Sequence, residues 1–191
     1  MNRKDAEMRG IRSVMVVGAV LLVTLFLGVK AGFCAVACSD LPGMISDPGL
    51  MVPLSAEVRP AAGGMPEYCE VRGTLTPEIK FAVKLPTGWN ERFYMVGGGG
   101  FNGAINDGAM TPAVARGYVT TGTDSGHDGQ KETLGTFAYN PPNNSNPNAL
   151  QKKLDFAYRS YYDTAVLAKK IIKAYVQKSV SLNEEVLGDW I

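Results

Sequence analysis

The sequence has few histidines and cysteines, and it has no large excess of either basic or acidic residues. It contains a single histidine and three cysteines among 191 residues. Zinc centres are commonly built from several such side chains, and no metal site is expected in this chain. The 19 basic residues are nearly balanced by 18 acidic ones, which gives a formal net charge of +1. This balance excludes the basic surface typical of nucleic-acid-binding proteins, so no nucleic-acid partner is expected.

The composition is that of a globular protein. Hydrophobic residues make up 46% of the chain and charged residues 19%, whereas disordered chains have too few apolar side chains to build a core. A chain of 191 residues is long enough for one domain with a substantial core. No internal repeat is visible, so we expect one domain after an N-terminal targeting segment.

The first 37 residues are expected to form a signal peptide, and the domain is expected to span residues 38–191. Four basic residues among the first 12 precede the apolar run VMVVGAVLLVTLFLGV, residues 14–29, which is the order of a secretory signal. The run is shorter than the ~20 residues that span a bilayer, and an uncleaved anchor helix is the alternative. Cleavage is expected after Ala31 or after Ala37. The mature chain would then be secreted or periplasmic.

The three cysteines take their interpretation from this expected export. Disulfides persist outside the cytoplasm, and Cys34 falls in the tail of the signal, so Cys38 and Cys69 are the favoured pair. Such a bridge would tie the mature N-terminus to the first expected strand. The alternative is that AVAC is a weak lipobox. In that case Cys38 is lipidated and Cys69 is free, and only then would the mature chain have a membrane partner.

Strand patterns dominate the first half of the expected domain. Residues 38–66 show no sustained period and are expected to form an irregular arm. The stretch EIKFAVKLP alternates apolar and charged side chains, which predicts a half-buried antiparallel strand. RFYMV is short and almost wholly apolar, as in a strand covered on both faces. Further strands are expected in EYCEVRGTLT and YVTTGTD.

Helical patterns become more frequent in the second half. MTPAVARG favours a short helix with Thr111 as N-cap, Pro112 at its first position and Gly117 after its end. Residues 128–148 are polar and are expected to form a long loop. Beyond them, apolar residues recur at steps of three and four, which predicts a long helix. Its expected buried face consists of Leu154, Tyr158, Tyr161, Ala165, Ala168, Ile172 and Tyr175. Antiparallel strands followed by alternating strands and helices predict an α/β fold with an antiparallel N-terminal edge.

A glycine-rich stretch, GGGGFNG at residues 97–103, follows the expected strand RFYMV. Glycine lets another group come close to the main chain. Gly98, Gly100 and Gly103 fit the dinucleotide motif G-x-G-x-x-G, with Asp124 about 20 residues further on. That motif requires a helix to begin within the glycine run, whereas AINDG is expected to break one. The other interpretation is an oxyanion loop, whose backbone N–H groups bind the charged oxygen of a transition state.

Three long motifs resemble one protein family. The segments CEVRGTLTPEIKFAVKLPTGWNERFYMVGGGGFNGAI, ARGYVTTGTDSGHD and FAYRSYYDTAVLAKKIIKAY resemble the tannase and feruloyl esterase family of secreted α/β-hydrolases. The resemblance implies hydrolysis of carboxylic esters of aromatic acids by a Ser-His-Asp triad, with a small aromatic ester as substrate. It implies that Gly100 donates the oxyanion N–H, with Gly99 supporting the site. Cys38 and Cys69 match the family's N-terminal disulfide. The family's calcium site would lie in a lid region outside this chain, so no cofactor is expected in it.

The sequence departs from the family pattern after Tyr175. The family continues with the nucleophile elbow G-C-S-x-G-G, but no G-x-S-x-G occurs in the 191 residues, and residues 177–191 are off-pattern. The expected fold is therefore an incomplete α/β-hydrolase, truncated before its nucleophile elbow. Catalysis by this chain alone is not expected, because an activated serine and its base are missing. A secreted, non-catalytic binding protein on the same scaffold is the alternative.

The single histidine, His127, lies in DSGHD, which the family carries before its nucleophile. It is therefore not expected to be the triad base. Asp124 and His127 are expected to form a buried, hydrogen-bonded turn that supports the site. The alternative is a catalytic dyad of Ser125 and His127, which the spacing disfavours because residues two apart rarely face each other.

Overall fold

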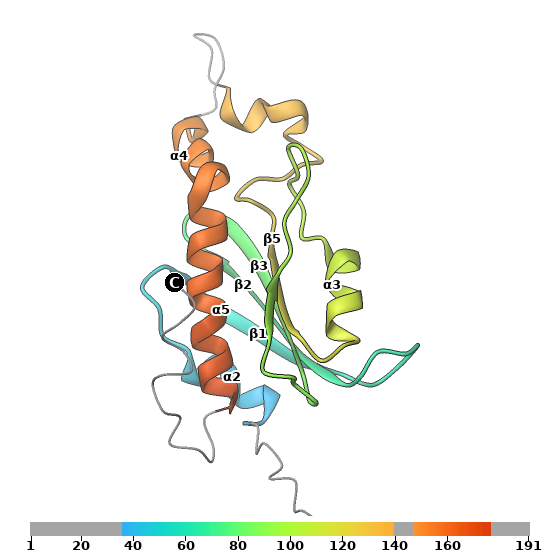
Figure 1. Ribbon diagram of the computed structural model, residues 1–191. Helices are drawn as coiled ribbons and strands as arrows, with labels where there is room; N and C mark the ends of the chain where they lie inside the picture. The colour runs from blue at the N-terminus through green and yellow to red at the C-terminus, as the bar shows by residue number, and fades with distance from the viewer. Residues whose placement is uncertain (1–35, 140–146, 177–191) are drawn as a thin grey trace, which may run out of the picture. The chain divides into compact units, whose positions relative to one another are not determined.

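Five strands form one mixed sheet, and the computed structural model describes it within residues 36–139 and 147–176 (Figure 1). The strands are β1 Leu50–Arg59, β2 Tyr68–Leu75, β3 Ile79–Pro86, β4 Phe93–Met95 and β5 Val119–Thr123. They are paired in the order β1-β2-β3-β5-β4. The pairs from β1 to β5 are antiparallel, whereas β4 lies parallel to β5. This arrangement confirms the predicted α/β class with an antiparallel N-terminal edge.

Two predicted segments lie outside the described residues. These are the expected signal peptide up to residue 35 and the off-pattern residues 177–191. Among the helices that the structure describes, none combines the length and apolar character that crossing a membrane requires.

Helices lie on both faces of the sheet (Figure 1). The long helix α5, Ser160–Val176, packs on one face, and α3, Asp107–Val114, packs on the other. Helix α5 continues directly from α4, Ala149–Leu154, through a π turn, Asp155–Arg159. Shorter helical turns are η1 Cys38–Asp40, α2 Leu41–Met44 and η2 Thr133–Ala138.

The two faces of the sheet have different cores. The main core lies between the sheet and α5, where Phe81 and Val83 of β3 share one cluster with Leu167 and Ile171 of the helix. Ala82 of β3 points to the other face, because side chains alternate along a strand. There it joins a smaller cluster, whose other buried members are Val96 and Met110.

An ionic network occupies much of the α3 face. Lys84 of β3, on the charged face of the predicted strand, is only 5% exposed. The strand is antiparallel as predicted, but it is covered on both faces rather than half-buried. Asp107, at the start of α3, pairs with Lys84 at 2.8 Å and with Arg72 at 2.7 Å. Burial would raise the pKa of Asp107, but the hydrogen bonds from Arg72 and Lys84 outweigh it and lower that pKa. The network thereby fastens the N-terminal end of α3 to the sheet.

A disulfide joins Cys38 to Cys69, as the sequence favoured. Both cysteines are buried and belong to the main core. The bridge connects η1 to β2 across a sequence separation of 31 residues. On the chain-entropy model, closing a loop of that length contributes about 3 kcal/mol to stability.

Strand β1 was missed by the sequence analysis, which expected an irregular arm over residues 38–66. The strand lies at an edge of the sheet, and most of its side chains are exposed. It therefore carries no alternating apolar pattern of the kind that reveals a half-buried strand. Its pairing with β2 also shifts register between Met51 and Ser55. That stretch contains Pro53, which has no N–H to donate to a ladder.

Strand β4, predicted to be covered on both faces, lies instead at the other edge of the described sheet. Its central residue, Tyr94, is 49% exposed. An apolar run of three to five residues does not reveal whether neighbours cover it, because that depends on elements far away in the sequence. By contrast β5, the strand beside it, is buried along its whole length, as predicted.

Helix α3 begins earlier than the sequence analysis predicted. Its N-cap is Asn106, whose side-chain oxygen accepts a hydrogen bond from the Ala109 N–H at 3.0 Å. The AINDG stretch therefore starts a helix rather than breaking one, since asparagine is among the best N-cap residues. Pro112 consequently lies inside the helix and Thr111 is not its cap. Gly117 follows the helix end with a φ of +81°, as predicted.

The segment predicted as a polar loop, residues 128–148, contains the helical turn η2. Phe137 in that turn is 1% exposed. Glu132, which precedes the turn, binds the Lys152 ammonium of α4 through both carboxylate oxygens at 2.7 Å. This contact connects η2 to α4. Residues 140–146 of the predicted loop lie outside the described part of the chain.

The long helix is confirmed, but its predicted buried face is wrong in the first half. Leu154 is 39% exposed and Tyr158 is 55% exposed, whereas Ala168 and Ile172 further along are buried. The π turn at Asp155–Arg159 explains the difference. A π turn takes more residues per turn than an α-helix, so the faces before and after it are out of phase.

Candidate functional site

The two parallel strands bring two unusual segments to the same edge of the sheet. Strand β4 is followed by residues 97–103, here called the glycine loop. Strand β5 is followed by residues 124–128, here called the DSGHD turn. Because β4 and β5 are parallel neighbours, their carboxyl ends meet at one edge, which is where sites commonly form in α/β proteins.

Three hydrogen bonds hold the glycine loop. The Gly98 N–H donates to the Tyr161 hydroxyl oxygen of α5 at 3.1 Å. The Phe101 carbonyl lies 3.3 Å from Nε2 of His127. The Gly103 carbonyl accepts from the Gly129 N–H at 3.0 Å. Both ends of the loop and its aromatic residue are therefore fastened to neighbouring elements.

The middle of the loop, Gly99 and Gly100, remains exposed. No hydrogen bond among the described residues uses the N–H of either glycine. A Cβ placed on either one would meet no atom within 4 Å, and Gly100 has a φ of +57°. The ends of the loop are thus held by neighbouring residues, and its middle leaves two backbone N–H groups available to a ligand.

The DSGHD turn is packed in the interior. Asp124, 4% exposed, accepts hydrogen bonds through one carboxylate oxygen from the N–H groups of Lys80 and Gly126, both at 2.9 Å. Burial raises the pKa of Asp124 to about 6, although those two hydrogen bonds act in the opposite direction. The carboxylate therefore joins strand β3 to the turn.

Ser125 and His127 do not face each other. The Ser125 hydroxyl lies 3.4 Å from the Tyr161 hydroxyl, and Nε2 of His127 faces the Phe101 carbonyl. The other ring nitrogen of His127, Nδ1, is buried without a hydrogen-bond partner among the described residues. A serine is activated by a base within hydrogen-bond reach of its oxygen, so this geometry does not form the alternative Ser125–His127 dyad.

An aromatic cluster connects the loop to the turn. The His127 ring stacks on Phe137 of η2, with centroids 3.9 Å apart. Phe156 of the π turn lies 5.1 Å from Phe137 and 6.0 Å from Phe101 of the glycine loop. Phe101 of the loop therefore packs against Phe137 and Phe156, which in turn pack against His127. Phe101 itself is still 57% exposed.

The dinucleotide interpretation of Gly98, Gly100 and Gly103 meets two difficulties in this geometry. Helix α3 begins at Asp107, beyond the glycine run, so its N-terminal N–H groups do not belong to the loop as the motif requires. The residue at that N-terminus is also an ion-paired carboxylate, which would repel a phosphate. Within the described residues, no group of three His, Cys, Asp or Glu side chains is placed to hold a metal ion.

The sequence analysis missed Tyr161 and Phe156 as part of this site. Tyr161 was assigned to the helix core by its spacing alone, and Phe156 was given no role. The only available signal was the aromatic richness of FAYRSYY, which does not reveal what the rings contact. Gly100, Gly99, Asp124 and His127, the residues expected at the site, all lie in the two segments described above.

Comparison with curated proteins gives relatives that are named esterases or hydrolases. A mono(2-hydroxyethyl) terephthalate hydrolase from Piscinibacter sakaiensis is 32% identical over 141 residues, which cover 63% of this chain and 22% of the relative. A probable feruloyl esterase from Arthroderma benhamiae is 35% identical over 96 residues, covering 50% and 17% of the two chains. This chain thus spans about a fifth of the length of these relatives.

Solved structures share the fold. Feruloyl esterase B from Aspergillus oryzae superposes with a TM-score of 0.60 at 23% identity, over 72% of this chain and 29% of the esterase. Tannin acyl hydrolase from Aspergillus niger gives a TM-score of 0.58 at 18% identity, over 75% and 30%. Residues 63–183 match the family model described as tannase and feruloyl esterase. The chain therefore belongs to the tannase and feruloyl esterase family.

Proposed function

We propose that this chain supplies the oxyanion loop of a carboxylic ester hydrolase that acts on small esters of aromatic acids. The observation that carries the proposal is the state of Gly99 and Gly100. Both residues are exposed, and neither N–H makes a hydrogen bond among the described residues, while the residues on either side are held by Tyr161, His127 and Gly129. An oxyanion hole requires hydrogen-bond donors that are fixed in position and point toward the oxygen on which negative charge develops.

Gly100 is the donor of choice within this loop. An ester carbonyl oxygen has to come within about 3 Å of the donor nitrogen, and a side chain at that position would stand in its path. The positive φ of Gly100 also favours glycine on its own account. The aromatic acid part of the substrate is suggested by the names of the relatives, which include feruloyl and terephthalate ester hydrolases.

The 191 residues by themselves are proposed to be inactive. They contain no G-x-S-x-G, and their one histidine is committed to Phe101 and Phe137. An oxyanion donor without a nucleophile and a base leaves only weak residual catalysis, about 1,000- to 10,000-fold over water in well-formed sites. Ester hydrolysis by the purified chain should therefore not exceed that of its Ser125→Ala variant.

The donor role can be tested in a chimera. Residues 63–176 of this chain would replace the matched segment of the Piscinibacter sakaiensis hydrolase, which supplies the rest of an ester hydrolase. Gly100→Ala should then lower kcat by about 100-fold, as loss of a well-aimed oxyanion donor does. The matched control is Gly63→Ala, because Gly63 has a φ of +56° and equally open surroundings. That variant carries the same backbone strain far from the loop and should keep its kcat.

Three outcomes would count against the proposal. A folded chimera without ester hydrolysis would mean that this glycine loop does not support the reaction. Equal kcat values for the two alanine variants would reduce the loop to a plain turn. Binding of a nicotinamide dinucleotide by the chain itself would favour the other interpretation of the glycines.

Export is proposed to follow the expected signal. The Cys38–Cys69 disulfide supports it, because such bonds persist in oxidising compartments. N-terminal sequencing of exported protein should begin between residues 32 and 38. Mass spectrometry that finds an acylated Cys38 would show that the lipobox interpretation was right and that the chain is attached to a membrane.

A further inference from the structure

Tyr161 connects three segments that are far apart in the sequence. Its ring extends from α5, and its hydroxyl oxygen lies 3.1 Å from the Gly98 nitrogen and 3.4 Å from the Ser125 hydroxyl. Gly98 is the second residue of the glycine loop, and Ser125 lies in the DSGHD turn. One phenol group therefore holds both segments that follow the parallel strands.

The direction of the bond to Gly98 is fixed by chemistry. A backbone N–H can only donate, so the Tyr161 oxygen accepts. Ser125 has a φ of +63°, and its side chain is fully buried. The buried turn thus fixes the position of the Ser125 hydroxyl, and α5 fixes the position of the Tyr161 ring. The oxygen that receives the Gly98 N–H is held from two sides.

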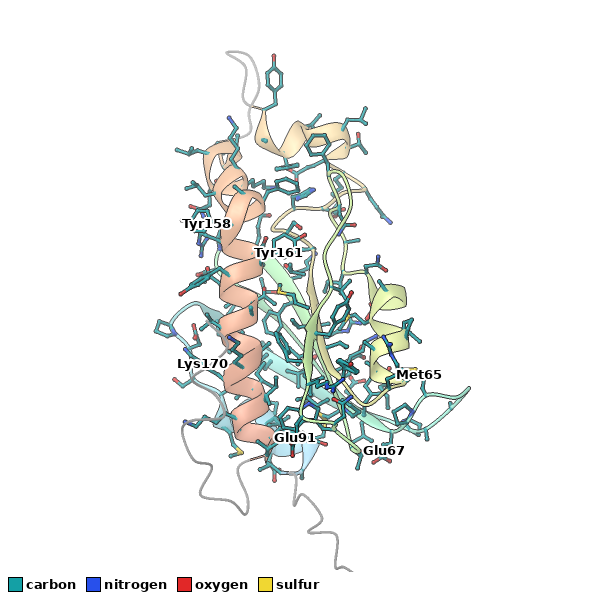
Figure 2. The ribbon with its side chains drawn as sticks, in the orientation of Figure 1. Met65, Glu67, Glu91, Tyr158, Tyr161 and Lys170 are labelled. Carbon is teal, nitrogen blue, oxygen red and sulfur yellow. A yellow bond between two sulfur atoms is a disulfide. The ribbon has the colours of Figure 1, made fainter. Side chains whose placement is uncertain are left out.

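Neighbouring tyrosines on the same helical segment have no such role. Tyr158 is 55% exposed and Tyr162 is 67% exposed, whereas Tyr161 is partly buried. Figure 2 shows Tyr161 on the side of α5 that faces the sheet and Tyr158 on the opposite side. Tyr161 and Tyr162 are therefore adjacent in the sequence but differ in their contact with the glycine loop.

We infer that the Tyr161 hydroxyl is the positioning group that sets the direction of the Gly99 and Gly100 N–H groups. Gly98 is the last fastened residue before these two donors. Gly99 and Gly100 have no side chains, and the described residues show no hydrogen bond to either, so on that side their orientation depends on Gly98. There Tyr161 supplies the hydrogen bond, and the Asn102 side chain lies close by. The inference rests on the proposed function for its consequence in catalysis, but the positioning itself is a property of this chain.

The positioning is tested in the 191-residue chain with Tyr161→Phe, which removes one oxygen and keeps the ring. Tyr162→Phe is the matched control. Hydrogen exchange of the Gly98 amide, followed by NMR, should become about tenfold faster in Tyr161→Phe, as loss of one hydrogen bond predicts. Backbone order parameters at Gly99 and Gly100 should fall, while exchange in β2 and β3 and the melting temperature stay close to those of the control.

The consequence for catalysis is tested in the chimera described above. Tyr161→Phe should lower kcat about tenfold with little change in KM, because it loosens a donor that acts in the transition state. Ser125→Ala, which keeps the Gly98 bond but removes the second support, should have a smaller effect. A chimera inactive with Tyr161 in place would refute the proposed function, while the exchange results would still decide the positioning.

Two results would overturn the inference. One is unchanged exchange and order at residues 98–100 in Tyr161→Phe. The other is a general rise in exchange throughout the sheet, or loss of cooperative unfolding, which would show that the hydroxyl serves the fold at large rather than the loop.

Discussion

The glycine loop and the DSGHD turn leave the sheet from adjacent parallel strands, yet they differ in almost every physical respect. In the turn, Asp124, Ser125 and His127 are all less than 5% exposed. In the loop, Gly99 and Gly100 are exposed, and a Cβ placed on either would meet no atom within 4 Å. The turn uses its polar groups to bind its own chain, whereas the loop leaves two donors unused.

The difference indicates that the turn supports the surrounding structure, whereas the loop presents hydrogen-bond donors. Most polar groups buried in the turn are hydrogen-bonded within the chain, as buried polar groups usually are, and Nδ1 of His127 is the exception. These hydrogen bonds fix the elements around the turn. The loop can present free N–H groups only because the turn, η2 and α5 hold its ends. We therefore expect substitutions in the turn and at the loop ends to affect folding, and substitutions in the middle of the loop to affect function.

The largest effect is expected where the two segments touch. A Cβ on Gly103 would overlap the backbone nitrogen and Cα of Gly129 and come within 2.9 Å of the His127 ring. Backbone cannot yield as a flexible side chain does, so Gly103→Ala should cost about 4 kcal/mol or more, above the usual range for overpacking. Chemical denaturation measures this cost. Gly99→Ala is the control and should change stability by less than about 0.5 kcal/mol.

The next effect compares two glycines that share positive φ. Gly126 in the turn has a φ of +79°, and a Cβ there would lie 2.7 Å from Cβ of the buried Asp155. Gly126→Ala should destabilise by about 3 kcal/mol through strain and overlap together. Gly100→Ala meets no atoms and should cost only about 1 kcal/mol, from strain alone. Equal losses in thermal unfolding would mean that the surroundings of the two glycines matter less than their φ.

A pH-dependent effect belongs to the turn alone. Burial raises the pKa of Asp124 from 3.8 to about 6, so the folded state holds the proton more tightly than the unfolded state. Its contribution to stability is complete below about pH 4 and is lost as the pH rises to about 6. The loss amounts to at most about 3 kcal/mol.

The measurement is urea unfolding between about pH 4 and pH 7 for the wild type and Asp124→Asn, which keeps the acceptor oxygen and cannot ionise. The stability of the wild type relative to Asp124→Asn should fall across this range. Asp128→Asn is the control in the same segment, because hydrogen bonding lowers the pKa of Asp128 and no such fall is expected. A flat difference for Asp124 would show that its carboxylate is ionised without penalty.

The smallest effect on stability is expected for a substitution in η2, which packs against the glycine loop. Leu134 is 89% exposed and has a φ of +53°, a conformation that costs a leucine about 1 kcal/mol or more. Leu134→Gly should therefore stabilise the chain by roughly 0.5 kcal/mol in thermal unfolding, because the relief of this strain exceeds the extra conformational entropy that glycine loses on folding. A loss of stability instead would mean that the exposed leucine makes a contact that outweighs its strain.

Local patterns were sufficient to locate β2, β3, β5 and the long helix, because the spacing and type of their residues distinguish strands from helices. They did not give the full burial of β3, whose Lys84 is covered. They failed for β1 and for the cover of β4, since an edge strand takes its partners from elsewhere in the chain. They also misplaced the first half of the helix face. A π turn leaves no mark in a spacing of threes and fours, so Leu154 and Tyr158 were placed in the core although they lie at the surface.

The sequence by itself determined the glycine-rich loop, the favoured cysteine pair, the α/β pattern and the family, because all of these are written in residue types at fixed spacings. It could not determine which glycines would be fastened and which left free. That was decided when β4 paired in parallel with β5 and α5 packed across the sheet. The pairing brought the loop against the turn, and the packing brought Tyr161, 63 residues from Gly98, within hydrogen-bond distance of it. Contacts of this kind depend on three-dimensional proximity, which no local pattern encodes.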